Sequence, residues 1–132
     1  MSDIRSDRDL LVWRKSMDLT VRCYQVTECF PKSELFGLTS QIKRAAYSIP
    51  FNISEGHGRR RSRAVYANHI DIALGSQSEL ENTIELALRL NFTTEVIANE
   101  LFDSIAEVGR MLSGLARSLE KGKETLSLVP NT

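Results

Sequence analysis

Apolar residues recur every three or four positions over four long segments of this 132-residue chain, and no segment alternates strictly between apolar and polar residues. A period near 3.6 is typical of an amphipathic α-helix, whereas alternation would indicate a β-strand. The pattern predicts a flexible tail over residues 121–132 and helices over about residues 9–29, 34–57, 62–90 and 95–120. Because short connections favour antiparallel neighbours, we expect an all-α fold, a single up-down-up-down four-helix-bundle domain over residues 1–132.

The apolar stripe of each predicted helix gives the residues expected in the core. The fourth stripe is the clearest and holds Ala98, Leu101, Ile105, Val108, Leu112, Leu115 and Leu119. The third holds Tyr66, His69, Ala73, Ser76, Leu80, Thr83, Ala87 and Leu90. The first holds Leu10, Trp13, Met17, Val21 and Tyr24, widened by Val12, Leu19, Cys23 and Val26. The second holds Leu35, Leu38, Ile42, Ala45 and Ile49, and continues to Ile53 beyond a kink expected at Pro50.

Capping residues support the helix boundaries. Gly56 and Gly58 are expected to end the second helix, because glycine readily adopts the left-handed conformation that follows many helices. Ser62 and Thr94 precede the third and fourth helices and can accept hydrogen bonds from their first free N–H groups. Asn91 is expected in the left-handed conformation at the end of the third helix.

Composition and the two cysteines favour a globular protein of the cytoplasm. Apolar residues make up 42% and charged residues 26% of the chain, ordinary values for a water-soluble domain. No apolar run approaches the roughly 20 residues that a membrane span needs, and the charged N-terminus does not resemble a signal peptide. Cys23 and Cys29 project from one helix in different directions, so we expect no disulfide between them and interpret both as small core residues.

Catalytic and metal-binding motifs are missing from the sequence. The only histidines, His57 and His69, belong to no Glu-x-x-His pair of the kind that binds iron in helical bundles. No Cys and His residues have the spacing of a zinc site, and no glycine-rich phosphate-binding loop is present. We therefore expect no enzyme, no metal and no cofactor, and interpret both histidines as structural residues.

Charge is unevenly distributed along the chain, although the net charge is zero. Residues 32–63 carry seven basic and two acidic side chains, whereas residues 64–132 carry five basic and ten acidic ones. Arginine suits phosphate because its planar guanidinium donates two parallel hydrogen bonds. No aromatic residues alternate with the arginines in the way that base-stacking sites require. The candidate nucleic-acid-binding residues are Lys43, Arg44, Arg59, Arg60, Arg61 and Arg63.

Polar and small residues interrupt the second and third helices at Gln41, Ser48, Asn52, Glu55, Gly75, Ser76 and Glu79. Glycine within a helix costs about 1 kcal/mol relative to alanine, so we expect a tight helix–helix contact at Gly75. We also expect Ser76 and Asn52 to form hydrogen bonds across the helices, and a buried Arg44 to pair with one of the two glutamates. The alternative interpretation of these positions is a site for a ligand or a partner.

Two stretches, Leu38–Gly56 and Ala73–Leu80, carry a recognisable set of residues. The set consists of Gln41, Arg44, Ala45, Ser48, Ile49, Pro50, Asn52, Ile53, Glu55, Gly56, Ala73, Gly75, Ser76, Glu79 and Leu80. With Trp13 and Met17, it resembles the 23S ribosomal RNA intervening-sequence protein family, also called the four-helix-bundle protein family, over about residues 9–120. Lys43 stands where arginine is common in the family, a change that keeps the charge.

The resemblance implies a four-helix bundle that assembles into a ring, a homopentamer. Some members of the family are encoded within inserts in ribosomal RNA genes. A related accessory protein of diversity-generating retroelements has a similar fold and binds nucleic acid and a reverse transcriptase. The family offers no established catalytic residues to carry over to this chain.

Two functions remain open on this evidence. The first is a non-catalytic, oligomeric accessory protein that binds RNA or DNA through the basic loop between the second and third helices. The second is a protein–protein adaptor without nucleic-acid contact, in which the acidic second half of one subunit meets the basic loop of another. Exposure of the arginines in the assembled ring distinguishes the two functions.

Overall fold

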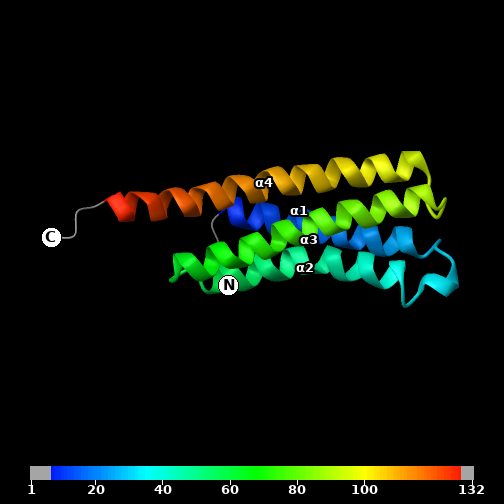
Figure 1. The fold of residues 1–132 in the computed structure, drawn as a ribbon, viewed down its shortest axis with the longest axis horizontal. Coiled ribbons are helices and arrows are strands. Elements are labelled where there is room, and N and C mark those ends of the chain that lie inside the picture. The colour runs from blue at the N-terminus through cyan, green and yellow to red at the C-terminus, as the bar shows by residue number, and fades with distance from the viewer. Residues whose placement is uncertain (1–6, 129–132) are drawn as a thin grey trace.

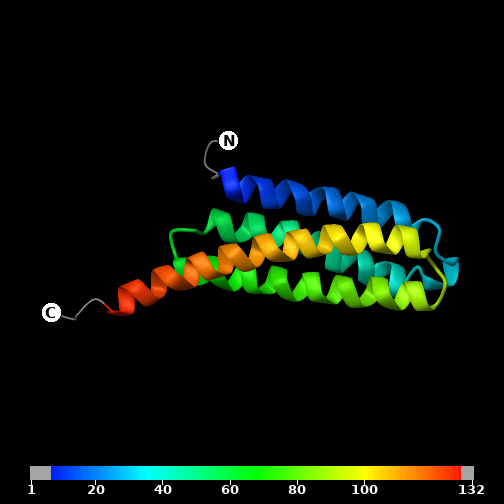
Figure 2. The same ribbon diagram turned by 90° about the horizontal axis from the view of Figure 1, so that it is seen from above.

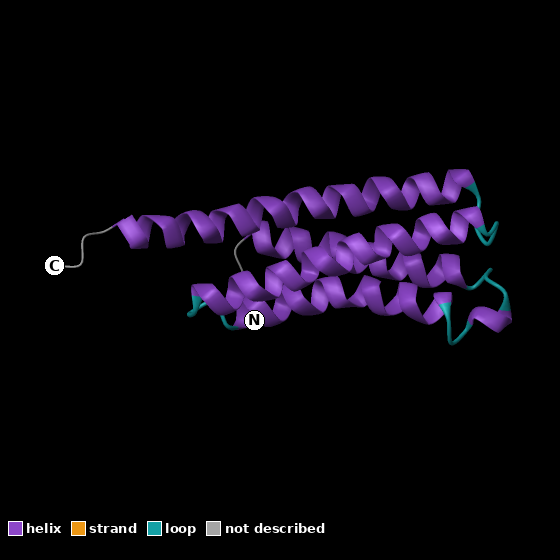
Figure 3. Ribbon diagram, viewed as in Figure 1, coloured by secondary structure: helices purple, strands orange, loops and turns teal. Residues whose placement is uncertain are grey.

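The structure, a computed structural model, describes the backbone of residues 7–128 and the side chains of residues 11–120. Within this part of the chain every long element is an α-helix and no strand is present (Figure 3). A short 3-10 helix, η2 (Lys32–Glu34), follows the first of the four helices, which are α1 (Asp7–Thr27), α2 (Leu38–Gly58), α3 (Arg63–Arg89) and α4 (Glu95–Leu128). The all-α prediction is confirmed.

The four helices lie side by side along one long axis, and each runs opposite to the next (Figures 1 and 2). Each helix packs against its neighbours in the chain, and α4 closes the bundle against α1. The α2–α3 turn lies at the same end as the start of α1 and the end of α4, while the other two connections lie at the opposite end (Figure 1). This is the arrangement of an up-down-up-down four-helix bundle.

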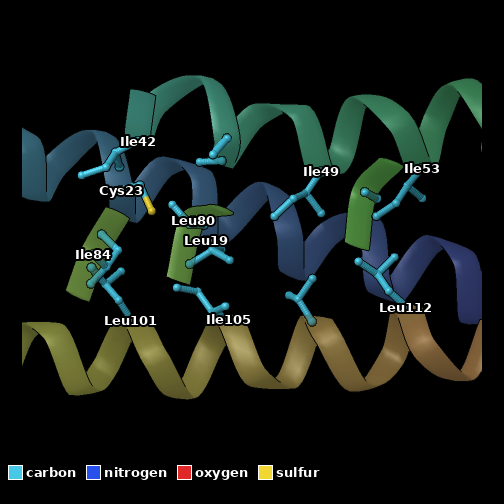
Figure 4. Close-up of a cluster of buried hydrophobic side chains, with 14 of the residues drawn as sticks. Leu19, Cys23, Ile42, Ile49, Ile53, Leu80, Ile84, Leu101, Ile105 and Leu112 are labelled. Carbon is cyan, nitrogen blue, oxygen red and sulfur yellow. The ribbon is translucent and has the colours of Figure 1, made fainter. Parts of the chain in front are cut away.

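The core is built mainly from branched aliphatic residues of all four helices (Figure 4). Every residue of the stripe predicted for α4 is buried, and so is the α2 stripe from Leu38 through Ile53. Leu35 precedes α2 and is exposed. In α3 the predicted stripe missed Ile70 and Ile84, which are fully buried, and included Leu90, which is exposed. The buried side of α3 is therefore wider than the predicted stripe.

The core side of α1 agrees only in part with the predicted one, because Val12, Leu19, Cys23 and Val26 are buried as expected. Val21 and Tyr24 are exposed, and the residues that are buried are Val12, Ser16, Leu19, Thr20, Cys23, Val26 and Thr27. The hydroxyls of Ser16 and Thr20 donate hydrogen bonds to the carbonyl oxygens of Trp13 and Ser16, each at 2.8 Å. Because these bonds satisfy the hydroxyls, small polar residues can occupy the core. Leu10 lies outside the described side chains.

Three predicted caps are confirmed. The Ser62 hydroxyl accepts a hydrogen bond from the Val65 N–H at 3.2 Å, and the Thr94 hydroxyl accepts one from the Ile97 N–H at 3.3 Å. Asn91 has a φ angle of 61°, in the left-handed region. These caps place the start of α3 and the α3–α4 connection as the sequence predicts.

Other helix limits differ from the prediction. The second helix begins at Leu38, where the Leu38 N–H donates to Glu34 Oε1 at 3.1 Å. The fourth helix continues to Leu128, so the part of the predicted flexible tail over residues 121–128 is helical. The lysine, glutamate and leucine residues of this segment have high helix propensity. No proline, which would interrupt the helix, occurs before Pro130. Residues 129–132 lie outside the described part of the chain.

A proline within α2 is compensated by α1. The helix continues through Pro50, which has no N–H and so leaves the Ala46 carbonyl without its helical donor. The Thr20 hydroxyl lies 3.1 Å from that carbonyl oxygen, so it can share its one proton between the carbonyls of Ser16 and Ala46. This contact joins α1 to α2 at the point where proline weakens the helix.

Gly56 allows α2 and α3 to approach each other closely. The residue is buried, and a Cβ atom on it would lie 2.9 Å from Cβ of His69 and 3.0 Å from Cδ1 of Tyr66. No glycine in the described part of the chain has a positive φ angle. The second helix ends at Gly58, as predicted, but neither Gly56 nor Gly58 adopts the left-handed conformation, and the role of Gly56 is close packing.

Candidate nucleic-acid interface

The basic candidate residues fall into two groups at opposite ends of α2. Lys43 and Arg44 lie near its amino end, and the four arginines between Arg59 and Arg63 lie where it turns into α3. The groups are separated by about 24 Å along the helix axis, at about 1.5 Å per residue. One phosphate cannot contact both groups, so they are separate candidate sites.

The first site is the arginine turn, which consists of residues 59–63. All four of its arginine side chains are exposed. The Nε of Arg59 lies 3.2 Å from Oε2 of Glu55, and the Nη1 of Arg60 donates to the His57 carbonyl at 2.9 Å. The Arg59–Glu55 pair is more than half exposed on both sides, so it holds the arginine only weakly. The guanidinium groups therefore remain accessible to a ligand.

A surface hollow of about 540 Å³ adjoins the arginine turn between α3 and α4. Its residues on α3 include Arg63 and Asp71, and its residues on α4 include Leu119 and Glu120. The two carboxylates oppose binding of an anion inside the hollow. The candidate contacts for phosphate are therefore the exposed arginine side chains themselves.

The second site surrounds Lys43 and Arg44, which have aromatic neighbours that were not predicted. The Nζ of Lys43 lies 4.7 Å from the centroid of the Tyr24 ring, within the range of a cation–π interaction. Tyr47 and Phe51 follow on α2, with ring centroids 5.1 Å apart. Phe36 precedes α2 and is 91% exposed. We call this site the aromatic–cationic surface and define it as Tyr24, Phe36, Lys43, Arg44, Tyr47 and Phe51.

The sequence contains a signal for the aromatic–cationic surface. Arg44, Tyr47 and Phe51 are spaced by three and four residues, so they share one side of α2. That side lies outside the apolar stripe that forms the core. The prediction considered aromatic residues only among the arginines of the turn, and so it overlooked those near Lys43.

Four polar side chains connect α2 to α3 by hydrogen bonds. Ser76 Oγ donates to Ser48 Oγ at 2.8 Å, and Asn52 Nδ2 lies 3.1 Å from the same oxygen. Asn52 Oδ1 lies 3.0 Å from His69 Nδ1, which donates because the amide oxygen can only accept. The hydrogen bonds predicted for Ser76 and Asn52 across the helices are confirmed. This connection satisfies half-buried polar groups and fixes the register of the two helices.

Three predictions about these positions are wrong. Arg44 is exposed rather than buried, and Glu55 pairs with Arg59. Gly75 is also exposed, and a Cβ atom on it would meet no atom of the neighbouring elements within 4 Å. Within the described chain Gly56 and Gly109 are buried and closely packed, whereas Gly75 lies on the outer surface of α3.

The outer surface of α3 carries a second regular stripe. Its members are exposed residues spaced by three and four positions, which is the spacing of a seam that packs against another helix. Ile72 and Leu86 within it are 44% and 47% exposed. Outside this stripe Gln41 of α2, another of the polar positions noted in the sequence, is also exposed. We define the outer α3 stripe as Ile72, Gly75, Glu79, Asn82 and Leu86.

The two cysteines lie in different surroundings. Both cysteines are free, and burial raises the pKa of the Cys23 thiol to about 12, against a smaller opposing effect of Arg22. Cys29 is exposed, so its predicted core position is wrong.

No three His, Cys, Asp or Glu side chains in the described part are grouped to bind a metal. None of the described helices has a stretch that is apolar and long enough to span a membrane.

These observations define a four-helix bundle with a basic turn at one end and an aromatic–cationic surface near the other. The chain belongs to the 23S rRNA-intervening sequence protein family, whose model matches residues 8–114. This confirms the family that the sequence resembles. The family is linked by its name to an intervening sequence of 23S rRNA.

A solved structure has a similar fold. It is a crystal structure at 1.70 Å of a protein with unknown function from the S23 ribosomal protein family of Bacteroides thetaiotaomicron. The two sequences are 27% identical and the TM-score is 0.76, over 83% of this chain and 98% of that chain. Among curated proteins, none matches this sequence significantly.

Proposed function

We propose that this chain is a non-catalytic, oligomeric accessory protein that binds RNA or DNA through the arginine turn. The observation that carries the proposal is the exposure of all four arginine side chains in one short turn at an end of the bundle. Guanidinium groups in this arrangement can form bidentate hydrogen bonds with successive phosphates. The family name, which refers to an insert in ribosomal RNA, supports nucleic acid as the class of partner.

The proposed oligomer is a homopentameric ring, and the outer α3 stripe is the proposed contact between subunits. Ile72 and Leu86 supply exposed apolar surface on either side of Gly75. The missing side chain of Gly75 leaves room for another subunit to approach the α3 backbone. Sedimentation equilibrium tests the ring: a mass of one 14.9 kDa chain at micromolar concentration contradicts it.

Binding of a fluorescein-labelled structured RNA, measured by anisotropy at several salt concentrations, tests the arginine turn. Affinity should fall as salt rises, because each phosphate contact releases counterions. A variant in which Arg59, Arg60, Arg61 and Arg63 are replaced by Glu should lose binding but keep its helicity and oligomeric mass. In the matched control, four other exposed arginines are replaced by Glu: Arg14, Arg89, Arg110 and Arg117. This control should retain RNA binding that the arginine-turn variant loses.

The outer α3 stripe also favours a second candidate function, a protein–protein adaptor with no nucleic-acid contact. In that case the arginine turn of one subunit would meet acidic residues of its neighbour. Loss of the ring in the arginine-turn variant would support the adaptor. Unchanged affinity for RNA in a variant that keeps its ring would contradict binding through the turn.

A further inference from the structure

The aromatic–cationic surface exposes rings that the bundle does not use in its core. Phe36 and Phe51 are 91% and 59% exposed, and neither belongs to the buried cluster. Tyr47 contacts Phe51 with a ring-centroid separation of 5.1 Å, which places two rings side by side on α2. A group of exposed aromatic side chains indicates a contact site for another molecule.

Two cationic side chains, Lys43 and Arg44, lie beside three of the rings, Tyr24, Phe36 and Tyr47. A hollow of about 340 Å³ is lined by Tyr24, Leu35, Phe36, Ser40, Lys43, Arg44 and Tyr47, and none of these residues is acidic. Glu34, close to Phe36 in the chain, accepts the Leu38 N–H at 3.1 Å. Glu28 lines the adjoining hollow together with Lys32, which balances its charge. The surface therefore favours an anionic partner.

Two of the rings and one of the cations lie on the same side of α2. Ser40, Arg44, Tyr47 and Phe51 are spaced by four, three and four residues, so they follow one side of α2. This row is about 16 Å long at about 1.5 Å per residue.

We propose that the aromatic–cationic surface binds single-stranded nucleic acid, stacking bases on its rings and pairing phosphates with its two cations. Every base has a flat π-face, so aromatic side chains can stack on a strand of any sequence. A duplex does not offer these faces because its bases are stacked on each other. The inference rests on the proposed class of partner, nucleic acid, but not on the arginine turn at the other end of α2.

Charge also disfavours a second copy of this surface as the occupant. In a two-fold contact the same residues of both chains meet, so Lys43 and Arg44 of one chain would lie near those of the other. Like charges brought together in this way repel each other. A strand of phosphates is complementary to both the charge and the rings.

The test measures binding of fluorescein-labelled oligouridine to the full chain. The variant Phe36→Ala/Phe51→Ala removes two exposed rings and keeps both cations. It should weaken oligouridine binding by at least about tenfold, because stacking on aromatic side chains supplies much of the affinity for single strands. Its dependence on salt should not change, since no phosphate contact is lost. Binding of inorganic polyphosphate, which has no bases, should be the same as in the wild type.

Two further variants separate stacking from charge. Lys43→Ala/Arg44→Ala should lower the slope of log affinity against log salt by about 0.7 for each lost phosphate contact. Leu90→Ala/Val96→Ala removes two exposed apolar side chains near the α3–α4 connection and serves as the matched control. This control should bind oligouridine as the wild type does.

Each outcome decides between the two sites. Unchanged oligouridine affinity in the Phe36/Phe51 variant overturns this inference, and loss of binding in the arginine-turn variant then still supports the proposed function. Normal binding by the arginine-turn variant, with loss in the Phe36/Phe51 variant, supports this surface and contradicts the turn. A changed oligomeric mass in the Phe36/Phe51 variant identifies the surface as a subunit contact and overturns the inference. Wild-type protein that binds no nucleic acid overturns both proposals.

Discussion

Two glycines of the α2–α3 pair lie in opposite surroundings. Gly56 is buried, and a Cβ atom on it would lie only 2.9 Å from Cβ of His69. Gly75 is exposed, and a Cβ atom on it would meet nothing from the neighbouring elements within 4 Å. Both lie inside helices, where glycine costs about 1 kcal/mol relative to alanine. Contact within the chain accounts for Gly56 alone, and this difference is the reason to propose an intermolecular contact at Gly75.

The two cysteines of α1 and its following turn show the same contrast between the inside and the outside of the bundle. Cys23 is buried among the helices, whereas Cys29 is exposed. Burial keeps the Cys23 thiol neutral because a thiolate would lose its hydration there. The inner surfaces of the bundle thus disfavour a charged group, and the outer surfaces carry features that packing within the chain does not require.

The largest expected effect concerns the stability of the inner region at high pH. The pKa of Cys23 is about 12 in the folded chain and 9.0 in the reference state. Above about pH 9 the unfolded chain loses this proton while the folded chain keeps it, so stability should fall as pH rises toward 12. The loss approaches about 1.4 kcal/mol per pH unit within this window. Urea unfolding at several pH values measures it.

The matched variant for this prediction is Cys23→Ala. Other groups that titrate in the same range are common to both proteins, so the difference between their pH profiles isolates Cys23. Parallel profiles for the wild type and Cys23→Ala would show that the thiol is not protected by burial. A steeper fall in the wild type is the expected result.

The next effect sharpens the comparison of the glycines. Gly56→Ala places a methyl group against His69 and Tyr66, which should cost about 1–3 kcal/mol in the free energy of unfolding. The control is Gly58→Ala, two residues away, where a Cβ atom meets nothing within 4 Å. Urea denaturation that leaves both variants equally stable would show that α2 and α3 can separate at Gly56 without cost.

Much of the fold is predictable from the sequence, because core stripes and caps are local features. The α4 stripe and the caps at Ser62 and Thr94 depend only on spacing and residue type. The core side of α1 was predicted only in part: Val12, Leu19, Cys23 and Val26 are buried as expected. Ser16 and Thr20 were missed because they are polar by type but are satisfied by carbonyls of their own helix. A serine or threonine whose hydroxyl is bonded to its own helix can therefore belong to the buried side, although the apolar pattern excludes it.

The candidate sites were less predictable, because they depend on which segments the fold brings together. Gly56 follows Ile53 by three residues and so continues the buried side of α2, a signal that was present but not used. The aromatic–cationic surface combines Tyr24 of α1 with Lys43 of α2, and only the packing of the two helices brings them to 4.7 Å. Spacing along one helix cannot reveal a contact of this kind.

A smaller effect is expected at the joint between α1 and α2. Thr20→Val removes the hydroxyl that compensates Pro50 and should cost about 1–2 kcal/mol, because the Ala46 carbonyl then lacks a donor. In the Pro50→Ala background the helix supplies its own N–H to that carbonyl, so the same change should cost less. A double-mutant cycle measures the coupling, and equal costs in the two backgrounds would contradict the compensation.

The smallest effect tests the outer glycine. Gly75→Ala should stabilise the isolated chain by about 0.5–1 kcal/mol, because alanine favours the helix and its methyl group meets no neighbouring element. This sign is opposite to that expected at Gly56, although both substitutions add one methyl group to a helix.

If Gly75 contacts another subunit, Gly75→Leu should leave the chain folded but weaken the oligomer, since a larger side chain blocks the approach of the second backbone. Circular dichroism follows the folding and sedimentation equilibrium follows the mass. A ring that persists in Gly75→Leu would show that the outer α3 stripe is not the subunit contact, and a destabilised Gly75→Ala would show that the glycine is packed after all.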